Sequence, residues 1–458
     1  MHVLLRGRMK KLQEKDQHWV HPVTALMDHQ AKGVCAWESA EGIHLVDVNG
    51  HRVQDAFSGL WCVNAGYGQQ SIVEAAKKQL EVLPYATGYF GFGSEPAIEL
   101  AYRLAKLAPP GLNHVIFGQG GSDAVDTAIR TVRYYFNAIG QPEKKHFIAV
   151  QRGYHGSSAV GSGLTALPVF HRYFDVPTST QHHIEAPYPY RHSAGPDETA
   201  VLAATVAALK SKVQEIGQGN VAAFICEPII GSGGVIVPPA GYLKAMRATC
   251  DELGILLIVD EVITGFGRTG PMFGCEHEGV SPDVMTMAKG LTSGYAPMGA
   301  TIISERMYAA IAEAGSDGTP FGHGQTYAGH PVSAAIANAT LDLYENGLLK
   351  NGTEVGEYFQ SKLRSLEKLD VVGQVRGRGM LAGVELVADK HTRAKPDAKL
   401  KMGQKILAHA FSEGLVFRAF NDDILGFAPS LNYTHADVDK LIEILTFSIE
   451  KVTGTRWG

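Results

Sequence analysis

Between residues 71 and 345 the chain alternates helical stretches with short apolar runs. Apolar residues that recur every three or four positions predict helices at 71–83, 96–108, 122–136, 199–213, 241–253 and 331–345. Short runs rich in valine, isoleucine, leucine and phenylalanine predict strands at 114–117, 146–150, 222–226, 256–259, 284–288 and 300–304. This alternation is typical of an α/β domain with a mainly parallel sheet, whose ligands gather at the carboxyl ends of the strands.

The two ends of the chain have a different pattern. A charged helix is predicted near 9–18, and strands at 42–48 and 52–57 flank an Asn49-Gly50 pair that favours a hairpin. Strands are also predicted at 371–376, 381–387 and 415–418, before a helix that starts at His435. We expect a large domain at 76–335 and a smaller α+β domain at 336–458, to which the N-terminal segment 1–75 contributes.

Composition narrows the class of protein. The 458 residues are 45% hydrophobic, which is enough for two domains and an enclosed site. Because 41 basic residues stand against 46 acidic ones, the net charge is −5, and nucleic acid and anionic membranes are not expected partners. No apolar run reaches the roughly 20 residues of a spanning helix, so we expect a cytoplasmic protein. The five cysteines and nineteen histidines show no metal-binding spacing, and no metal is expected.

Lys289 interrupts the apolar run 284–288 and is followed by a segment rich in glycine, serine and threonine. One interpretation is a lysine at a strand end whose head group stays in water. The other is a buried amine, because burial disfavours the charged form, lowers the pKa and leaves a nucleophile that can form a Schiff base. The other strand ends decide between the two.

A glycine-rich turn follows the predicted strand at 114–117. It ends with Gly121 and Ser122, directly before the helix at 122–136. Backbone N–H groups at a helix N-terminus bind anions, and Ser122 adds a hydroxyl group. Because Asp123 stands where a dinucleotide fingerprint has its third glycine, a single phosphate suits this turn better than a nicotinamide cofactor.

Three further side chains follow predicted strands. Tyr154 either stacks on a planar ring or fills a loop, and Glu227 follows the strand at 222–226. Asp260 ends a strongly apolar run, where it either caps a loop or pairs with a cationic or hydrogen-bond donor group. A phosphate cradle, an aromatic side chain that can stack on a ring, a carboxylate and a lysine at one sheet edge are the groups that pyridoxal 5′-phosphate (PLP) requires.

Longer motifs resemble the class III (omega) aminotransferases, which are PLP enzymes of fold type I. The resemblance covers nearly the whole chain and is carried by Ile258-Val259-Asp260-Glu261-Val262-Ile263-Thr264-Gly265-Phe266-Gly267-Arg268-Thr269-Gly270 and by Ala288-Lys289-Gly290-Leu291. Supporting motifs are Gly153-Tyr154-His155-Gly156, Glu227-Pro228 and Thr326-Tyr327-Ala328-Gly329-His330-Pro331. The implied fold is a large PLP-binding α/β domain with a smaller α+β domain.

The resemblance also implies roles for single residues. Lys289 would form the Schiff base and carry the substrate proton, and Asp260 would pair with the pyridine nitrogen, with Glu227 supporting that region. Tyr154 and Val262 would sandwich the ring. Gly121 and Ser122 would hold the phosphate, joined by Thr326 from a neighbouring subunit, which implies a homodimer with shared sites and possibly a tetramer. Gln119-Gly120 departs from the family's usual Asn-Ser at these positions.

Substrate choice is expected elsewhere in the chain. Arg418 could bind a carboxylate in bidentate fashion and swing aside for an apolar substrate, or it could form a surface ion pair with Asp422 or Asp423. In the pyruvate-dependent omega-aminotransferases a similarly placed arginine moves in this way, and Trp61 matches that subgroup's Ser-Gly-Leu-Trp. The other residues that the resemblance places in the substrate pocket are Tyr89, Phe90, Tyr154, Ser232 and Ile263.

The resemblance therefore implies ping-pong transfer of a primary amino group to pyruvate, giving alanine. The donor stays open among β-alanine, taurine, diamines, omega-amino acids and aryl amines. An aminomutase or a dialkylglycine decarboxylase would use the same Lys289 and Asp260, and would be distinguished by whether pyruvate is needed to regenerate the enzyme. A non-catalytic protein with the PLP fold is disfavoured because every chemical group is present.

Overall fold

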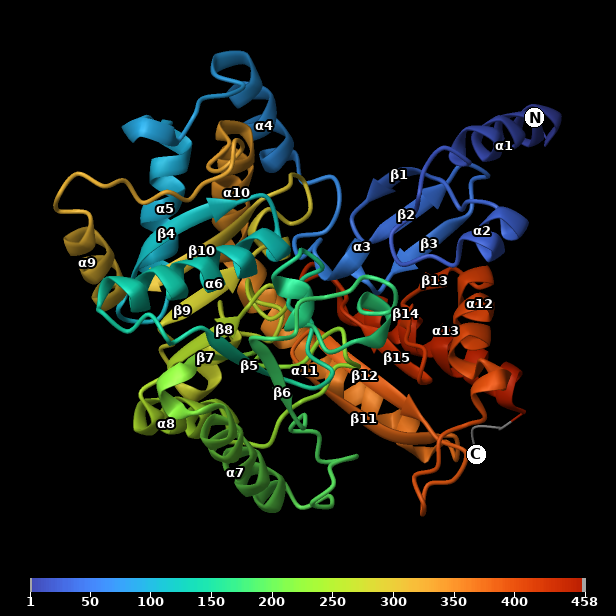
Figure 1. The fold of residues 1–458 in the computed structure, drawn as a ribbon. Helices are drawn as coiled ribbons and strands as arrows, with labels where there is room; N and C mark the ends of the chain where they lie inside the picture. The colour runs from blue at the N-terminus through green and yellow to red at the C-terminus, as the bar shows by residue number, and fades with distance from the viewer. Residues whose placement is uncertain (1, 455–458) are drawn as a thin grey trace.

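The chain folds around one large sheet that is covered by helices on both faces (Figure 1). The computed structural model, which describes residues 2–454, places seven strands in the order β4-β10-β9-β8-β7-β5-β6. They are β4 (Leu112–Gly118), β5 (His146–Val150), β6 (Gln181–Ile184), β7 (Val221–Cys226), β8 (Leu256–Asp260), β9 (Val284–Met287) and β10 (Gly299–Ser304). Only β10 runs against its neighbours β4 and β9, so the predicted mainly parallel sheet is confirmed.

Alternate residues of the central strands pack on opposite faces of this sheet. Phe224 and Cys226 of β7 join the core beneath one set of helices, whereas Ala223 and Ile225 join the core beneath the other. The first set is α5 (Glu95–Leu107), α7 (Glu198–Ile216) and α8 (Tyr242–Leu253); the second is α6 (Gly121–Ala138) and α9 (Glu305–Ala314). Because both faces are covered, the strands are continuous apolar runs, which is why the sequence predicted them.

Two four-stranded sheets lie beside the large one. The first, in the order β1-β2-β3-β13, consists of β1 (Trp37–Glu41), β2 (His44–Asp47), β3 (Arg52–Asp55) and β13 (Leu415–Val416). The second, in the order β11-β12-β15-β14, consists of β11 (Val372–Arg378), β12 (Leu381–Leu386), β14 (Arg418–Ala419) and β15 (Ile424–Phe427). Since β13 pairs with β3, the two ends of the chain share a sheet. This pairing supports the proposal that residues 1–75 belong with residues 336–458.

One predicted strand is divided between these two sheets. The sequence predicts a single strand at 415–418, but Leu415 and Val416 pair with β3, whereas Arg418 and Ala419 pair with β15. Phe417 is buried at the division. The chain therefore changes sheets directly before Arg418.

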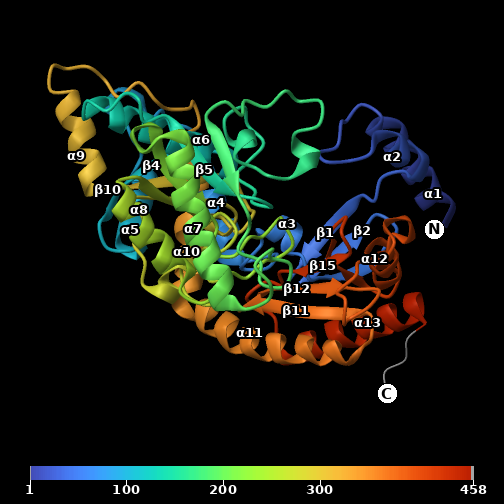
Figure 2. The ribbon, with the colours of Figure 1, turned by 60° about the horizontal axis from the view of Figure 1, so that its bottom comes forward.

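The remaining helices connect and flank the sheets. They are α1 (His2–Asp16), α2 (Leu26–Lys32), α3 (Ser58–Trp61), α4 (Gln70–Val82), α10 (Pro331–Leu343), α11 (Leu349–Arg364), α12 (Met402–Ser412) and α13 (His435–Thr453). In Figure 2, α11 runs from the large sheet towards β11 and α13. Within residues 2–454, no helix has the length and apolar character needed to cross a membrane.

The sequence pattern missed α2, β1, α3, β6, α9, α12 and β15. Strand β6 contains two histidines, so its alternation is hidden although Gln181 and Ile184 are buried. Helix α9 buries only Met307 and Ile311, which makes its apolar stripe narrow. Neither element carries a residue of the predicted site.

Candidate active site

Two neighbouring parallel strands bring Asp260 and Lys289 to the same sheet edge. Asp260 is the last residue of β8 and is paired with Thr286 of β9, three positions before Lys289. The backbone N–H of Glu261 continues this ladder with a hydrogen bond of 2.9 Å to the carbonyl of Thr286. Their adjacency follows from the parallel pairing of β8 and β9.

Lys289 is partly exposed as a whole residue, but protein atoms surround its amine. Burial lowers the pKa of its amine, although the nearby Asp260 carboxylate opposes this effect. Its φ angle of 44° is in the left-handed region, which is uncommon for a residue with a side chain. Backbone strain of this kind clusters at functional sites. The amine donates no hydrogen bond within the described chain.

A buried histidine holds the carboxylate of Asp260. His155 Nδ1 lies 2.8 Å from Asp260 Oδ2, and the two side chains are 0% and 4% exposed. The other oxygen, Oδ1, accepts a hydrogen bond of 3.1 Å from the backbone of Val262. Asp260 therefore caps the loop at Val262 and also pairs with a histidine. His155 Nε2 is buried without a partner.

Glu227 is a second buried carboxyl group at this edge. Its oxygens accept backbone hydrogen bonds from Tyr154 at 3.1 Å and from Gly231 at 2.8 Å. Burial raises the pKa of Glu227 to about 7; His155 opposes the shift and Asp260 adds to it. We call Lys289, Asp260, Glu227 and His155 the strand-end cluster.

The N-terminus of α6 faces this cluster. Helix α6 begins at Gly121, and no side chain caps it. A β-carbon on Gly121 would stand 2.9 Å from Val262 Cγ1, and one on Gly156 would stand 2.8 Å from Ser122 Oγ. Both glycines are therefore required for close packing of the loops at this helix end, where uncapped N–H groups favour an anion.

Trp61 and Ile263 form an apolar wall with Phe420. Trp61 is 3% exposed and meets the Phe420 ring edge to face, with 6.1 Å between centroids. A β-carbon on Gly231 would lie 2.5 Å from Ile263 Cδ1 and 2.9 Å from Trp61 Cζ3. The indole Nε1 is buried and has no partner. Trp61 is thus packed in this wall and keeps an unused donor.

Arg418 extends this wall. Its guanidinium lies 4.7 Å from the centre of the Phe420 ring, and Nε is buried without a partner. The predicted alternative of an ion pair with Asp422 or Asp423 is wrong. Asp422 pairs with Arg152 at 2.5 Å, and Asp423 accepts a hydrogen bond of 2.8 Å from the backbone of Gly403. We call Trp61, Ile263, Phe420 and Arg418 the aromatic wall.

Tyr154 stands between the strand-end cluster and the aromatic wall. It packs against Phe170 with 5.0 Å between ring centroids. Burial raises the pKa of its hydroxyl, the charge of Asp260 adds to the shift, and the charge of Arg418 opposes it. Ser232, the neighbour of Gly231, is partly exposed. His155, Phe170 and Phe420 were not among the site residues predicted from the sequence; the position of His155 beside Tyr154, and that of Phe420 two residues after Arg418, were signals for these two.

Three predicted site residues lie on a separate surface. Tyr89 and Phe90 are 38% and 92% exposed, and the hydroxyl of Tyr85 donates a hydrogen bond of 2.9 Å to the carbonyl of exposed Thr326. Gly324 lies against Tyr89, because a β-carbon there would be 3.1 Å from the tyrosine oxygen. No described contact joins these residues to Lys289 within the chain.

The segment after Lys289 is closely packed, although its glycines and serine suggest open space around the lysine. A β-carbon on Gly290 would lie 2.6 Å from Asn64 Nδ2, and Ser293 Oγ accepts a hydrogen bond of 2.9 Å from the backbone of Ala65. This segment is packed against residues 64 and 65. The close packing fixes the backbone that presents Lys289.

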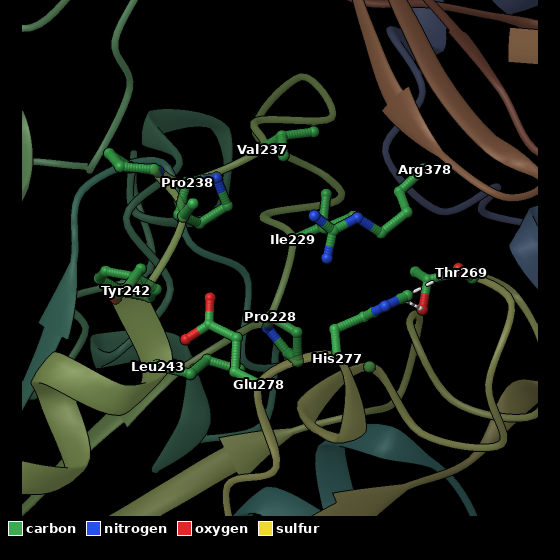
Figure 3. Close-up of a pocket in the computed structure, with 13 residues that line it drawn as sticks. Pro228, Ile229, Val237, Pro238, Tyr242, Leu243, Thr269, His277, Glu278 and Arg378 are labelled. Atoms are coloured by element: carbon green, nitrogen blue, oxygen red, sulfur yellow. Dashed lines mark hydrogen bonds between the residues drawn. The ribbon is translucent and has the colours of Figure 1, made fainter. Parts of the chain in front are cut away.

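A small cavity lies beside Pro228 and Ile229, directly after Glu227 in the chain (Figure 3). Pro228, Ile229, His277 and Arg378 are among its lining residues, and its volume is about 30 Å³. His277 is held by Thr269, with 3.0 Å from Nε2 to the backbone carbonyl oxygen. A space of this size holds about one water molecule, so it is not a binding site for an organic ligand.

The residues present fit PLP. An uncapped helix N-terminus suits a phosphate, a buried carboxylate with two partners suits a protonated ring nitrogen, and an amine without a hydrogen bond suits an aldehyde. These three features come from separate strand ends of one sheet. No metal is needed to complete this set.

Comparison with known proteins leads to the family that the sequence motifs resemble. The aminotransferase class-III family profile matches residues 26–449. The putrescine–pyruvate aminotransferase of Pseudomonas aeruginosa is 41% identical over 93% of each chain, and the diaminobutyrate–2-oxoglutarate transaminase of Halomonas elongata is 41% identical over 90% of this chain and 89% of its own. The omega-transaminase of Pseudomonas jessenii, solved in complex with PMP, superposes with a TM-score of 0.94 at 36% identity, over 97% of this chain and 98% of its own. The chain belongs to the class III aminotransferases, which are PLP-dependent enzymes.

Proposed function

We propose that the protein transfers a primary, often terminal, amino group from an amine or omega-amino acid to pyruvate. The product is alanine, and the mechanism is ping-pong. The observation that carries this proposal is Arg418, a largely enclosed guanidinium on the aromatic wall whose nearby carboxylates are engaged elsewhere. An arginine without an acidic partner beside Lys289 can bind the carboxylate of a keto acid.

Two similar enzymes take amine donors of the proposed kind, but they differ in their keto acid acceptor. One similar enzyme is a putrescine–pyruvate aminotransferase, and another uses diaminobutyrate with 2-oxoglutarate. Both donors carry a terminal amino group. The small size of pyruvate suits a site in which one guanidinium stands next to packed aromatic side chains.

PLP, when bound, supplies an aldehyde that condenses with amines and a ring that accepts electrons. The roles of this chain's residues follow from their positions. We propose that Asp260, held by His155 and the backbone of Val262, keeps a proton on the ring nitrogen. Gly121 and Ser122 would hold the phosphate, and Tyr154 and Val262 would bound the two faces of the ring.

Lys289 would hold the cofactor and then move a proton at the substrate carbon that bears the amino group. Burial lowers the pKa of its amine, which makes the neutral base more accessible than that of an exposed lysine. Glu227 would support this region through its two backbone partners. Trp61, Ile263 and Ser232 would bound the substrate side, opposite Tyr154.

The exposed residues Tyr89, Phe90 and Thr326 support a second proposal, namely that the enzyme is a homodimer. Tyr85 contacts both Tyr327 and Thr326, and no described contact joins these residues to Lys289 of the same chain. Exposed aromatic side chains that gather on one surface are typical of a protein–protein interface. In a dimer this surface would complete the partner's site, and sedimentation velocity would distinguish a dimer from a monomer or a tetramer.

Separate half-reactions test the proposed chemistry. The holoenzyme is mixed with one amine at a time, from β-alanine, taurine, a diamine and an aryl amine, and cofactor absorbance is followed. The reacted enzyme is then freed of amine and mixed with pyruvate or 2-oxoglutarate. We expect pyruvate to restore the starting spectrum and to yield about one alanine per site.

Two results would contradict the proposal. Restoration by 2-oxoglutarate but not by pyruvate would show that the acceptor is wrong. Restoration of the starting spectrum without any keto acid would indicate an aminomutase instead.

A further inference from the structure

The N-terminal arm, residues 8–42, lacks a hydrophobic core. Not one side chain in this range is buried, and the first buried residue of the chain after it is Ile43. In Figures 1 and 2 the arm's helices α1 and α2 lie at the far end of the molecule from α9. Something other than apolar burial must therefore hold the two helices together.

Helices α1 and α2 nevertheless meet closely. A β-carbon on Gly33, at the end of α2, would lie 2.4 Å from Gln13 Nε2 of α1. The exposed pair of Arg8 and Glu38, with 2.5 Å between nitrogen and oxygen, ties α1 to β1. A solvent-exposed ion pair contributes little to stability, because water screens the two charges.

The other contact between the helices is a cluster of Asp16, His21 and His29, which we call the arm cluster. Asp16, the last residue of α1, lies with Oδ1 2.8 Å from His21 Nε2 and with Oδ2 2.6 Å from His29 Nε2. The two imidazole rings are 4.4 Å apart, and the three side chains are only 12–19% exposed. Trp19 covers His21, with 4.2 Å between ring centres.

The ligand atoms of the arm cluster have the identity and spacing of a metal site. Within residues 2–454 this is the one group of three such side chains whose ligand atoms all lie within 4.8 Å of one another. Two imidazole nitrogens and one carboxylate oxygen are typical zinc ligands, and ligand atoms of a tetrahedral site stand roughly 3.3–3.5 Å apart. A shift of under about 1 Å would open the two short contacts to this spacing.

The sequence spacing of the cluster concealed it. Asp16, His21 and His29 come from a helix end, a loop and a second helix, and they match no metal-binding motif. The expectation from sequence that the chain holds no metal rests on such motifs alone. A loop reversal after α1, in which the backbone of Trp19 donates a hydrogen bond to the carbonyl of Asp16, begins the path that brings His21 back.

We propose that the arm cluster binds one zinc ion per chain and that the ion fastens α1 to α2. His21 Nε2, His29 Nε2 and one oxygen of Asp16 are three ligands, and water is the fourth because the cluster is partly exposed. The ion would replace the two imidazole–carboxylate hydrogen bonds. Its role is structural, since the cluster lies in the arm and shares no residue with the strand-end cluster or the aromatic wall.

Zinc titration of the tag-free, metal-depleted holoenzyme tests the proposal. We expect one zinc ion per chain in competition with a colorimetric chelator, and at least a tenfold weaker affinity in His21→Gln and in His29→Gln. His18→Gln is the matched control, because His18 is an exposed histidine of the same loop and makes no side-chain contact with the cluster. Its affinity should equal that of the wild type.

Limited proteolysis supplies the second measurement. Zinc should slow cleavage after Lys15 and Lys32 in the wild type and in His18→Gln, and should have no effect in the other two variants. Far-UV circular dichroism confirms that each variant is folded. Equal zinc binding by the wild type and the His21→Gln/His29→Gln double variant would overturn the site. Zinc binding without protection of the arm would overturn its role as a fastener.

Discussion

The strand-end cluster and the aromatic wall differ in how their polar groups are satisfied. Asp260 and Glu227 each accept two hydrogen bonds from the protein. On the wall, Arg418 Nε and Trp61 Nε1 are buried donors without partners. The acidic groups are therefore fixed before any ligand arrives, as preorganised electrostatics require, whereas the donors of the wall remain available to a substrate. We infer that the cluster sets the reaction and the wall sets the choice of substrate.

The largest effect should come from the cluster. Lys289→Ala removes the amine that we propose holds the cofactor and moves the substrate proton. We expect turnover to fall by at least about a thousandfold, with loss of the absorbance of lysine-bound cofactor. Rates and spectra of the two proteins provide the measurement, and transamination at the wild-type rate would refute the assignment.

A second buried lysine provides the control. Burial also lowers the pKa of Lys144, but its amine donates to the backbone carbonyls of Gly254 at 2.8 Å and of Val221 at 3.2 Å. Lys144→Met should lower the melting temperature and leave turnover per folded enzyme near the wild-type value. The pair of variants separates loss of a buried charge from loss of the reactive amine.

Changes in the wall should affect one half-reaction more than the other. Arg418→Ala removes a charge-assisted hydrogen bond, so the second-order rate constant with pyruvate should fall about 10- to 100-fold. The rate with a simple aryl amine should change by only about threefold or less, because that donor has no carboxylate. Stopped-flow measurement of both half-reactions is the test.

Two further variants sharpen the test at Arg418. Arg418→Met keeps an apolar stem against Phe420 and should behave like Arg418→Ala, whereas Arg418→Lys keeps the charge and should retain part of the pyruvate rate. Equal losses with pyruvate and with the aryl amine would argue that Arg418 is structural. The division of roles between cluster and wall would then fail.

The smallest effect concerns stability. Because burial raises the pKa of Glu227 from 4.5 to about 7, the folded protein keeps a proton that the unfolded chain has already released. The free energy of unfolding should therefore fall as pH rises through this window, by about 2 to 3 kcal/mol between pH 5 and pH 8 relative to Glu227→Gln. Urea unfolding of both proteins at the two pH values measures the difference.

Glu385 of β12 is the matched control. Burial alone would raise the pKa of Glu385, but Arg376, Lys395 and Arg191 overcome burial and lower it to about 2. Its contribution is present above pH 4.5 and is lost only as the pH falls towards 2, so Glu385→Gln should destabilise equally at pH 5 and pH 8. A pH-independent cost in Glu227→Gln as well would show that Glu227 is ionised throughout.

The strand ends of the cluster were predictable because their signals are local. A buried parallel strand is a continuous apolar run, and Asp260 and Lys289 are the first charged residues at the ends of two such runs. The N-terminus of α6, the proposed anion site, was also predictable, because its glycines form a local sequence pattern. The role of His155 was not predicted, because its contact with Asp260 joins residues that are 105 positions apart.

The wall was less predictable than the cluster. The sequence predicts a single strand at 415–418, but the chain changes sheets at Phe417, and Arg418 therefore pairs with β15 rather than with β3. Whether Asp422 and Asp423 neutralise Arg418 also depended on distant partners, namely Arg152 and the backbone of Gly403. Ion pairs of this kind depend on folding, and no local pattern encodes them.

By itself, the sequence determined the α/β architecture, the family and the candidate for the reactive lysine, because apolar periodicity and strand-end chemistry are properties of short segments. Only the tertiary structure decided which polar groups are satisfied. It gave Asp260 and Glu227 their partners, left Arg418 without one, and brought Asp16, His21 and His29 together from three separate segments. Burial and hydrogen bonding depend on residues far apart in the chain, and these two quantities set charge, reactivity and ligand choice.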